Sequence, residues 1–325
     1  MDARVSLALR ERRAQGISLA QLGELLAMPP ARALRAVEEL SRLGFVIETH
    51  PMMGVRLAAA PPSLLEAEVA CGLATRRVGR RVRCVESAAS TNDLAWEAAG
   101  GGPEASDGLA IFAEHQSAGR GRRGNRWLAP PHSSILCSVV AWLPQMPTLA
   151  AVLTQGAALA SAQAVQDQCG TPAGIKWPND VVVDDRKVGG ILVEARPAAG
   201  GTGPAVIGVG LNCTQGPEAF PPDIRPAVAS LGMLGDEPDR TLLARSLLRR
   251  LDEVLARMAD AVGMAALSRD AADRCRTLGR RMSVMEGGRV YSGEVVDLDA
   301  DYGLILRLPE GEMRSFPAMT THVVG

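Results

Sequence analysis

The chain has 325 residues, of which 22% are charged and 47% are hydrophobic, and its formal net charge is −1. This length and hydrophobic content predict two or three folded domains and exclude a wholly disordered chain. The near-zero charge argues against a protein dominated by nucleic-acid binding, although one basic face stays compatible with it.

No segment resembles a membrane span or a secretory signal. The longest apolar stretch, residues 149–162, is rich in alanine and is interrupted by Thr154, Gln155 and Gly156. The first 13 residues carry charges of both signs and no long apolar core. Six cysteines form no CxxC pair and are interpreted as buried hydrophobic residues of a reducing compartment. The sequence therefore predicts a cytoplasmic protein without a membrane partner.

Residues 1–60 predict a small helical unit. A short helix is expected after Ser18, which suits an N-cap, and a second helix over residues 31–43. Two short strands follow around a turn at residues 51–53. Helix–turn–helix followed by a hairpin is the layout of a winged helix. The two prolines at positions 61–62 indicate a linker.

Residues 63–278 predict a larger block in which strands and helices are mixed. Strand-like runs are expected at residues 110–114, 135–140, 181–183, 190–194 and 205–210. Two helices are expected at about residues 149–167 and 240–259. Several strands joined by short turns favour an α+β fold over a regular parallel α/β array.

Residues 279–325 change character again. Short alternating runs separated by glycine or aspartate turns predict about five strands and a small β-barrel. The predicted fold class is therefore α+β, with three domains at residues 1–60, 63–278 and 279–325.

Lysine is rare in this chain. Of 35 basic residues only Lys176 and Lys187 are lysines. A coding bias toward arginine explains the excess of guanidinium groups. Two retained lysines, eleven residues apart, still indicate a place that needs a compact charge on a flexible stem.

A glycine- and arginine-rich segment at residues 119–127 is the clearest candidate for anion binding. Three glycines allow the backbone to approach a ligand closely, and four arginines supply forks that suit phosphate or carboxylate oxygens. A disordered basic loop and an RNA-binding patch are the alternatives. The segment matches neither the GxGxxG nor the P-loop pattern, which excludes Rossmann and Walker sites.

Three further segments carry polar groups beside strands or helices. Residues 90–92 read Ser-Thr-Asn before a helix, which suits an N-cap or a set of donors for a small polar head group. Asn179 and Asp180 offer oxygen ligands that Mg²⁺ favours beside phosphates, or form an ordinary turn. Asn212 ends a strand, where its amide could contact a base edge or a ribose.

Together these segments resemble the biotin protein ligases. The motifs are STN at 90–92, QSAGRGRRG at 116–124, KWPND at 176–180, RKVGGILVE at 186–194 and GVGLN at 208–212. With the two terminal units, the chain is similar to the longer type of ligase, which also acts as a transcriptional repressor. The resemblance implies a winged helix, a class II synthetase-like, lipoate-ligase-like catalytic domain and an SH3-like C-terminal β-barrel.

The resemblance also implies a reaction in two steps. Biotin and ATP, with Mg²⁺, give biotinyl-5′-adenylate and pyrophosphate. Biotin then passes to a lysine of the biotin carboxyl carrier protein of acetyl-CoA carboxylase. Two alternatives are a bifunctional ligase and biotin-responsive DNA-binding repressor, and a lipoate–protein ligase.

The same resemblance assigns roles to residues that match the motifs. Biotin contacts are expected from Ser90, Thr91, Asn92, Gln116, Arg120, Gly121, Arg122 and Lys187. The groups expected to act in catalysis are Lys187, Arg120, Arg122 and Asp180. Nucleotide contacts are expected from Trp127, Asn212 and Arg123. Asp180 with Asn179 is the expected metal site.

DNA binding is expected to be weak or absent. Residues 1–60 carry eight arginines against six acidic residues. The second helix begins with Arg32 and Arg35 as its polar side chains, whereas base readout uses a richer set of polar groups. The turn at residues 51–54 has no cation. The sequence leaves open whether the chain is a monomer or a homodimer.

Overall fold

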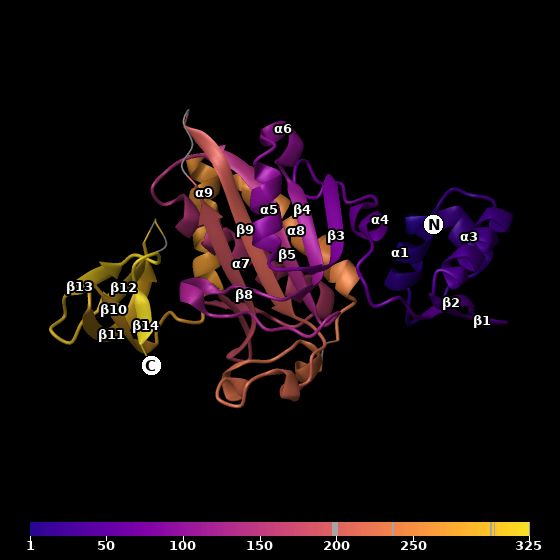
Figure 1. Cartoon of the computed structure of the whole chain (residues 1–325). Coiled ribbons are helices and arrows are strands. Elements are labelled where there is room, and N and C mark those ends of the chain that lie inside the picture. Colours follow the sequence, from indigo (N-terminus) through magenta and orange to yellow (C-terminus); the bar gives the residue numbers. More distant parts are fainter. Residues whose placement is uncertain (197–200, 236, 300, 302, 325) are drawn as a thin grey trace.

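The computed structural model describes residues 1–196, 201–235, 237–299, 301 and 303–324. The described strands form three sheets, and the largest sheet with its helices lies between an N-terminal helical unit and a C-terminal sheet (Figure 1). The two ends of the chain lie at opposite sides of the molecule in this view.

The N-terminal unit contains three helices and a hairpin. Its elements are α1 (Ala3–Glu11), α2 (Leu19–Leu25), α3 (Pro30–Arg42), β1 (Val46–His50) and β2 (Gly54–Ala59). Ser18 caps α2 as predicted, because its side chain accepts from Gln21 N while the Gln21 side chain accepts from Ser18 N. After α3 the backbone turns at Gly44, which has a φ of +90°. The predicted order of helices and strands is therefore observed.

The central part is built on a seven-stranded mixed sheet. Its strands are β3 (Arg81–Ala88), β4 (Leu109–Gln116), β5 (Ser134–Pro144), β6 (Gly174–Lys176), β7 (Asp180–Val183), β8 (Arg186–Ala195) and β9 (Thr202–Asn212). The order across the sheet is β3-β4-β5-β9-β8-β7-β6. Strands β3 and β4 are parallel, and every other neighbouring pair is antiparallel. This arrangement confirms the predicted α+β class.

Helices cover both faces of this sheet. They are α4 (Glu66–Ala70), α5 (Thr91–Ala99), α6 (Pro103–Ser106), α7 (Leu149–Cys169), α8 (Arg240–Arg257) and α9 (Ala261–Asp273), with short 3₁₀ turns η1 (Arg122–Gly124), η2 (Pro217–Ala219), η3 (Arg225–Ala227) and η4 (Gly232–Leu234). Helix α5 packs over Ile111, Val140 and Val206 on one face. The other face contacts α7 and α8, and Figure 1 shows these helices behind the strands. Of the described helices, none has the length and apolar character needed to cross a membrane.

The C-terminal part is a five-stranded antiparallel sheet. Its strands are β10 (Arg281–Glu286), β11 (Arg289–Leu298), β12 (Leu304–Arg307), β13 (Met313–Phe316) and β14 (His322–Val324), in the order β13-β12-β11-β10-β14. The sequence predicts a closed barrel, but within the described residues β13 and β14 remain unpaired edges, so the sheet is open. Its apolar core includes Val295 and Phe316 and continues onto Trp177 of the central part.

Candidate active site

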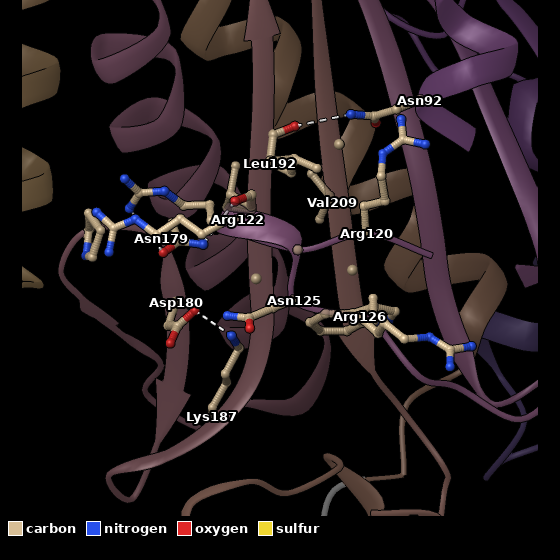
Figure 2. Close-up of a pocket in the computed structure, with 18 of the residues that line it drawn as sticks. Asn92, Arg120, Arg122, Asn125, Arg126, Asn179, Asp180, Lys187, Leu192 and Val209 are labelled. Atoms are coloured by element: carbon tan, nitrogen blue, oxygen red, sulfur yellow. Dashed lines mark hydrogen bonds and ion pairs between the residues drawn. The ribbon is translucent and has the colours of Figure 1, made fainter. Parts of the chain in front are cut away.

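One cavity of about 360 Å³ gathers nearly all of the residues that the motifs single out (Figure 2). The predicted site residues in its wall are Ser90, Thr91, Asn92, Gln116, Arg120, Gly121, Arg122, Arg123, Trp127, Asn179, Asp180 and Lys187. They come from the start of α5, the end of β4, the loop after it, and strands β7 and β8. Segments far apart in the sequence therefore contribute to a single site.

The inner end of the cavity is formed by the start of α5. Ser90 is the N-cap and accepts from Asn92 N, as its sequence position predicts. Thr91 and Asn92 are only 4% and 3% exposed. The Gln116 side-chain oxygen accepts from Thr91 N at 2.7 Å, which ties β4 to the helix. The motif thus acts as a helix cap and also lines the cavity with polar groups.

The arginine-rich loop is held by partners outside itself. Arg120 makes two bonds of 2.8 and 2.6 Å to the Asp93 carboxylate, and this pairing lowers the pKa of Asp93. Arg122 donates to the carbonyl of Ala318 at 2.5 Å, and Arg123 donates to the carbonyl of Thr321. The C-terminal part therefore fixes one side of the loop, a contact that the local sequence cannot reveal.

Lys187, on β8, lies in the cavity wall beside Asp180 and Trp127. Its Nζ is 2.6 Å from Asp180 Oδ1 and 5.8 Å from the centroid of the Trp127 ring (Figure 2). The Trp127 ring lies flat against β9, where a Cβ at Gly210 would come within 2.6 Å of it. The second glycine of the GVGLN motif, Gly210, therefore makes room for this ring. In the described part of the chain, Trp127 Nε1 is buried and has no hydrogen-bond partner.

Asn212 is the one predicted site residue that lies outside the cavity wall. Its side chain is buried and donates to the Ala229 carbonyl at 3.0 Å, while its oxygen accepts from Gln215 at 2.8 Å. The amide thus joins β9 to the loop that follows, and both of its ends are occupied. Nucleotide contact by Asn212 stays a prediction that this geometry does not favour.

The site offers positive charge and polar contacts more than nucleophilic chemistry. Burial raises the pKa of Cys84 to about 12 and also raises the pKa of Cys137 and Cys213, so these thiols are protonated near neutral pH. Within the described residues, no group of three or more histidine, cysteine, aspartate and glutamate side chains could hold a metal ion alone. Such a site suits reactions that depend on positioning and charge stabilisation.

Comparison with known proteins identifies the family. Residues 85–212 match the model of the biotin/lipoate A/B protein ligase family. The chain is 30% identical over 234 residues to the bifunctional ligase/repressor BirA of Bacillus subtilis, covering 71% of each protein. It is 37% identical over 227 residues to the biotin–[acetyl-CoA-carboxylase] ligase of Mycobacterium tuberculosis, covering 68% of this chain and 80% of that one. The chain belongs to the biotin protein ligase family.

The fold is also that of a solved member of this ligase family. The biotin protein ligase from Aquifex aeolicus in complex with biotin and ATP superimposes with a TM-score of 0.63 at 22% identity. The match covers 75% of this chain and 99% of that one. At this identity the likeness concerns the fold, and it agrees with the α+β architecture described above.

Two residues behind the cavity wall, Ser138 and Glu194, contact the predicted site residues and have no role among the sequence predictions. Ser138 is fully buried on β5 and lies 2.7 Å from Thr91 Oγ1 and 2.6 Å from Asn92 Oδ1. Glu194 ends the RKVGGILVE motif and accepts from the Asn92 side chain at 2.8 Å. A lone serine within an apolar strand is a weak signal, since its partners come from a distant helix.

Proposed function

We propose that this chain is an ATP-dependent biotin–protein ligase. It would form biotinyl-5′-adenylate and pyrophosphate from biotin and ATP, and then transfer biotin to a lysine of a biotin carboxyl carrier protein. The observation that carries the proposal is the single cavity in which the motif segments of this family meet. The name of the M. tuberculosis relative supports the acetyl-CoA carboxylase carrier as acceptor.

The cavity residues suit the first step because two anions must meet there. Ser90, Thr91, Asn92 and Gln116 would hold the biotin head group at the inner end. Arg120, Arg122 and Lys187 would offset the negative charge of the biotin carboxylate and the α-phosphate. Trp127 and Arg123, which line the cavity, would contact the nucleotide, and Gly121 would lie against biotin.

The donor set fits a magnesium ion that is also bound by the ATP phosphates. Asp180 has one oxygen 2.6 Å from Lys187 Nζ and a second carboxylate oxygen available, and Asn179 lies beside it in the cavity wall. One or two carboxylates plus phosphates are the usual magnesium ligands at nucleotide sites. Bound there, Mg²⁺ would neutralise phosphate charge. We propose that the reaction takes place in the cytoplasm, since six scattered cysteines without a CxxC pair suit a reducing compartment.

The direct test is incubation of the protein with ATP, Mg²⁺, biotin and a biotin carrier domain, followed by mass spectrometry. We expect a mass increase of the carrier that requires both biotin and ATP. Replacement of biotin by lipoate is the matched control and should give no increase. Modification with lipoate in place of biotin would favour a lipoate–protein ligase and contradict the proposal.

We expect residues 119–126 to become more protected from hydrogen exchange when biotinyl-adenylate is bound. Three glycines and four arginines hold little structure alone, because backbone entropy and like charges oppose it. Arg120, Arg122 and Arg123 are paired with Asp93, Ala318 and Thr321, which lie outside the segment. Exchange measured by mass spectrometry with and without adenylate checks this. Equal exchange rates in the two states would contradict it.

We expect the N-terminal unit to bind DNA weakly or not at all, so that the repressor function is absent. Helix α3 exposes Leu34 between Arg32 and Arg35. The turn of the hairpin presents Met52, which is 89% exposed. Few cations are therefore available for phosphate contacts. Titration against the protein's own biotin-operon promoter, with biotin and ATP present, checks this. Tight, sequence-selective binding at physiological salt would support the bifunctional alternative instead.

A further inference from the structure

A chain of short hydrogen bonds leads from Glu194 to the inner end of the cavity. Glu194 Oε2 accepts from Asn92 Nδ2 at 2.8 Å and from Trp96 Nε1 at 3.1 Å. Asn92 Oδ1 faces Ser138 Oγ at 2.6 Å, and Ser138 Oγ faces Thr91 Oγ1 at 2.7 Å. These contacts join β8, α5 and β5 in one line of polar atoms.

The carboxylate fixes the direction of every bond in this line. An ionised carboxylate only accepts, so the atom of Asn92 beside Glu194 is the amide nitrogen, and Oδ1 faces Ser138. A hydroxyl has a single proton, and Ser138 must give its proton to Asn92 Oδ1. Ser138 then offers Thr91 only lone pairs.

The proton of Thr91 is therefore used inside the protein. It goes to Gln116 Oε1 at 3.1 Å. Thr91 Oγ1 therefore presents only lone pairs to the cavity. Gln116 Oε1 also accepts from Thr91 N at 2.7 Å, which fixes the oxygen end of that amide. At Thr91 the inner end of the cavity is thus set to receive an N–H donor.

We infer that Glu194 is a positioning residue that selects a cyclic urea at this end of the cavity. This inference rests on the proposed function. The urea ring of biotin carries two N–H donors, whereas a lipoyl or octanoyl chain carries none. A buried acceptor left without a donor is costly, so the site discriminates against such chains.

The surroundings hold the line of bonds in place. Ser138 is 0% exposed and sits on the interior strand β5, between β4 and β9. A Cβ at Gly208 would come within 2.4 Å of Asn92 Oδ1, so the glycine leaves the amide its room. The Arg196 guanidinium stacks 3.9 Å above the Trp96 ring, whose N–H donates to the same Glu194 oxygen.

The first test is Glu194→Gln, assayed by pyrophosphate release with biotin and ATP varied separately. The Trp96 N–H keeps a glutamine oxygen where the carboxylate oxygen was, but a neutral amide accepts a hydrogen bond more weakly than a carboxylate, so Asn92 is held less firmly. We expect the KM for biotin to rise about tenfold, while kcat and the KM for ATP stay near wild type. Glu97 is an exposed carboxylate on α5, the helix that carries Asn92. Glu97→Gln is therefore the matched control and should behave as wild type.

The second test interrupts the line at its centre with Ser138→Ala. We expect a similar rise in the KM for biotin, and no further rise when Glu194→Gln is added. The two changes act through one path, so their effects should not add. Three results would each overturn the inference: additive effects of the two substitutions, an unchanged KM for biotin, or changes in kcat and in the KM for ATP as large as the change in the KM for biotin.

The two proposals fail in different ways. Wild-type protein that releases no pyrophosphate with biotin and ATP would overturn the proposed function, and the inference with it. Active wild-type protein whose KM for biotin is insensitive to Glu194→Gln and to Ser138→Ala would overturn the inference alone. Because the second variant leaves Glu194 intact, poor folding of the first would not prevent a decision.

Discussion

Lys187→Arg is expected to lower the rate of biotinyl-adenylate formation by about 10²- to 10³-fold. The substitution keeps the positive charge, so the loss would come from geometry. Lys187 Nζ lies 2.6 Å from Asp180 Oδ1, and a Cβ at Gly190 would already come within 3.4 Å of it. A planar guanidinium is larger and directs its donors differently from an ammonium group. Single-turnover pyrophosphate release with saturating biotin and ATP measures the effect.

Lys176→Arg is the matched control, because Lys176 is the other lysine of the chain. It is exposed at the rim of the same cavity, where a longer side chain has room. We expect this variant to lose less than about tenfold, since an exposed cation tolerates exchange of its head group better than an enclosed one. Wild-type pyrophosphate release by Lys187→Arg, or a larger loss in Lys176→Arg, would contradict the assignment.

The sequence predicts the site better than it predicts how the site is held. Motifs bring most of the cavity residues to attention because their residue types are unusual: glycine with arginine in one loop, and two retained lysines. Ser138 carries no such signal, and Glu194, although it ends the RKVGGILVE motif, is not an unusual residue type. Their roles depend on which strand lies beside α5, and that is a property of the whole sheet.

The predicted closed barrel of the C-terminal part is wrong because strand pairing across a whole sheet is not visible in local sequence. Alternation predicts the strands of the C-terminal part, but closure of a sheet depends on whether its two edge strands pair. Strands β13 and β14 do not pair within the described chain, so the sheet stays open. Contact of Asn212 with the nucleotide stays a prediction. Its amide donates to the Ala229 carbonyl and accepts from Gln215, and neither partner belongs to a motif.

Arg10→Met is expected to destabilise the contact between the N-terminal unit and the central part by about 3–5 kcal/mol. Arg10 lies on α1 and makes two 2.9 Å bonds to the Glu68 carboxylate of α4, and one 2.7 Å bond to Asp239. The Arg10 side chain is 6% exposed and that of Glu68 is 0% exposed. Burial opposes the charge of Arg10, but the two carboxylates outweigh it and raise its pKa.

The expected loss comes from the carboxylate that is left behind. Without Arg10, the Glu68 carboxylate stays buried and loses both of its hydrogen bonds to a cation, which costs more than the ion pair itself contributes. The double variant Arg10→Met/Glu68→Met removes both charges and should recover most of the stability. Arg4→Met, an exposed arginine on the same helix, is the matched control and should leave unfolding unchanged.

Chemical unfolding, combined with hydrogen exchange over residues 3–59, measures these effects. If the ion pair joins two units that fold separately, exchange should increase in this segment first and leave the large sheet protected. Equal stability of Arg10→Met and the wild type would show that Glu68 finds another partner or binds a proton. A double variant no more stable than Arg10→Met would show that the arginine stem, through its packing, matters more than the charge.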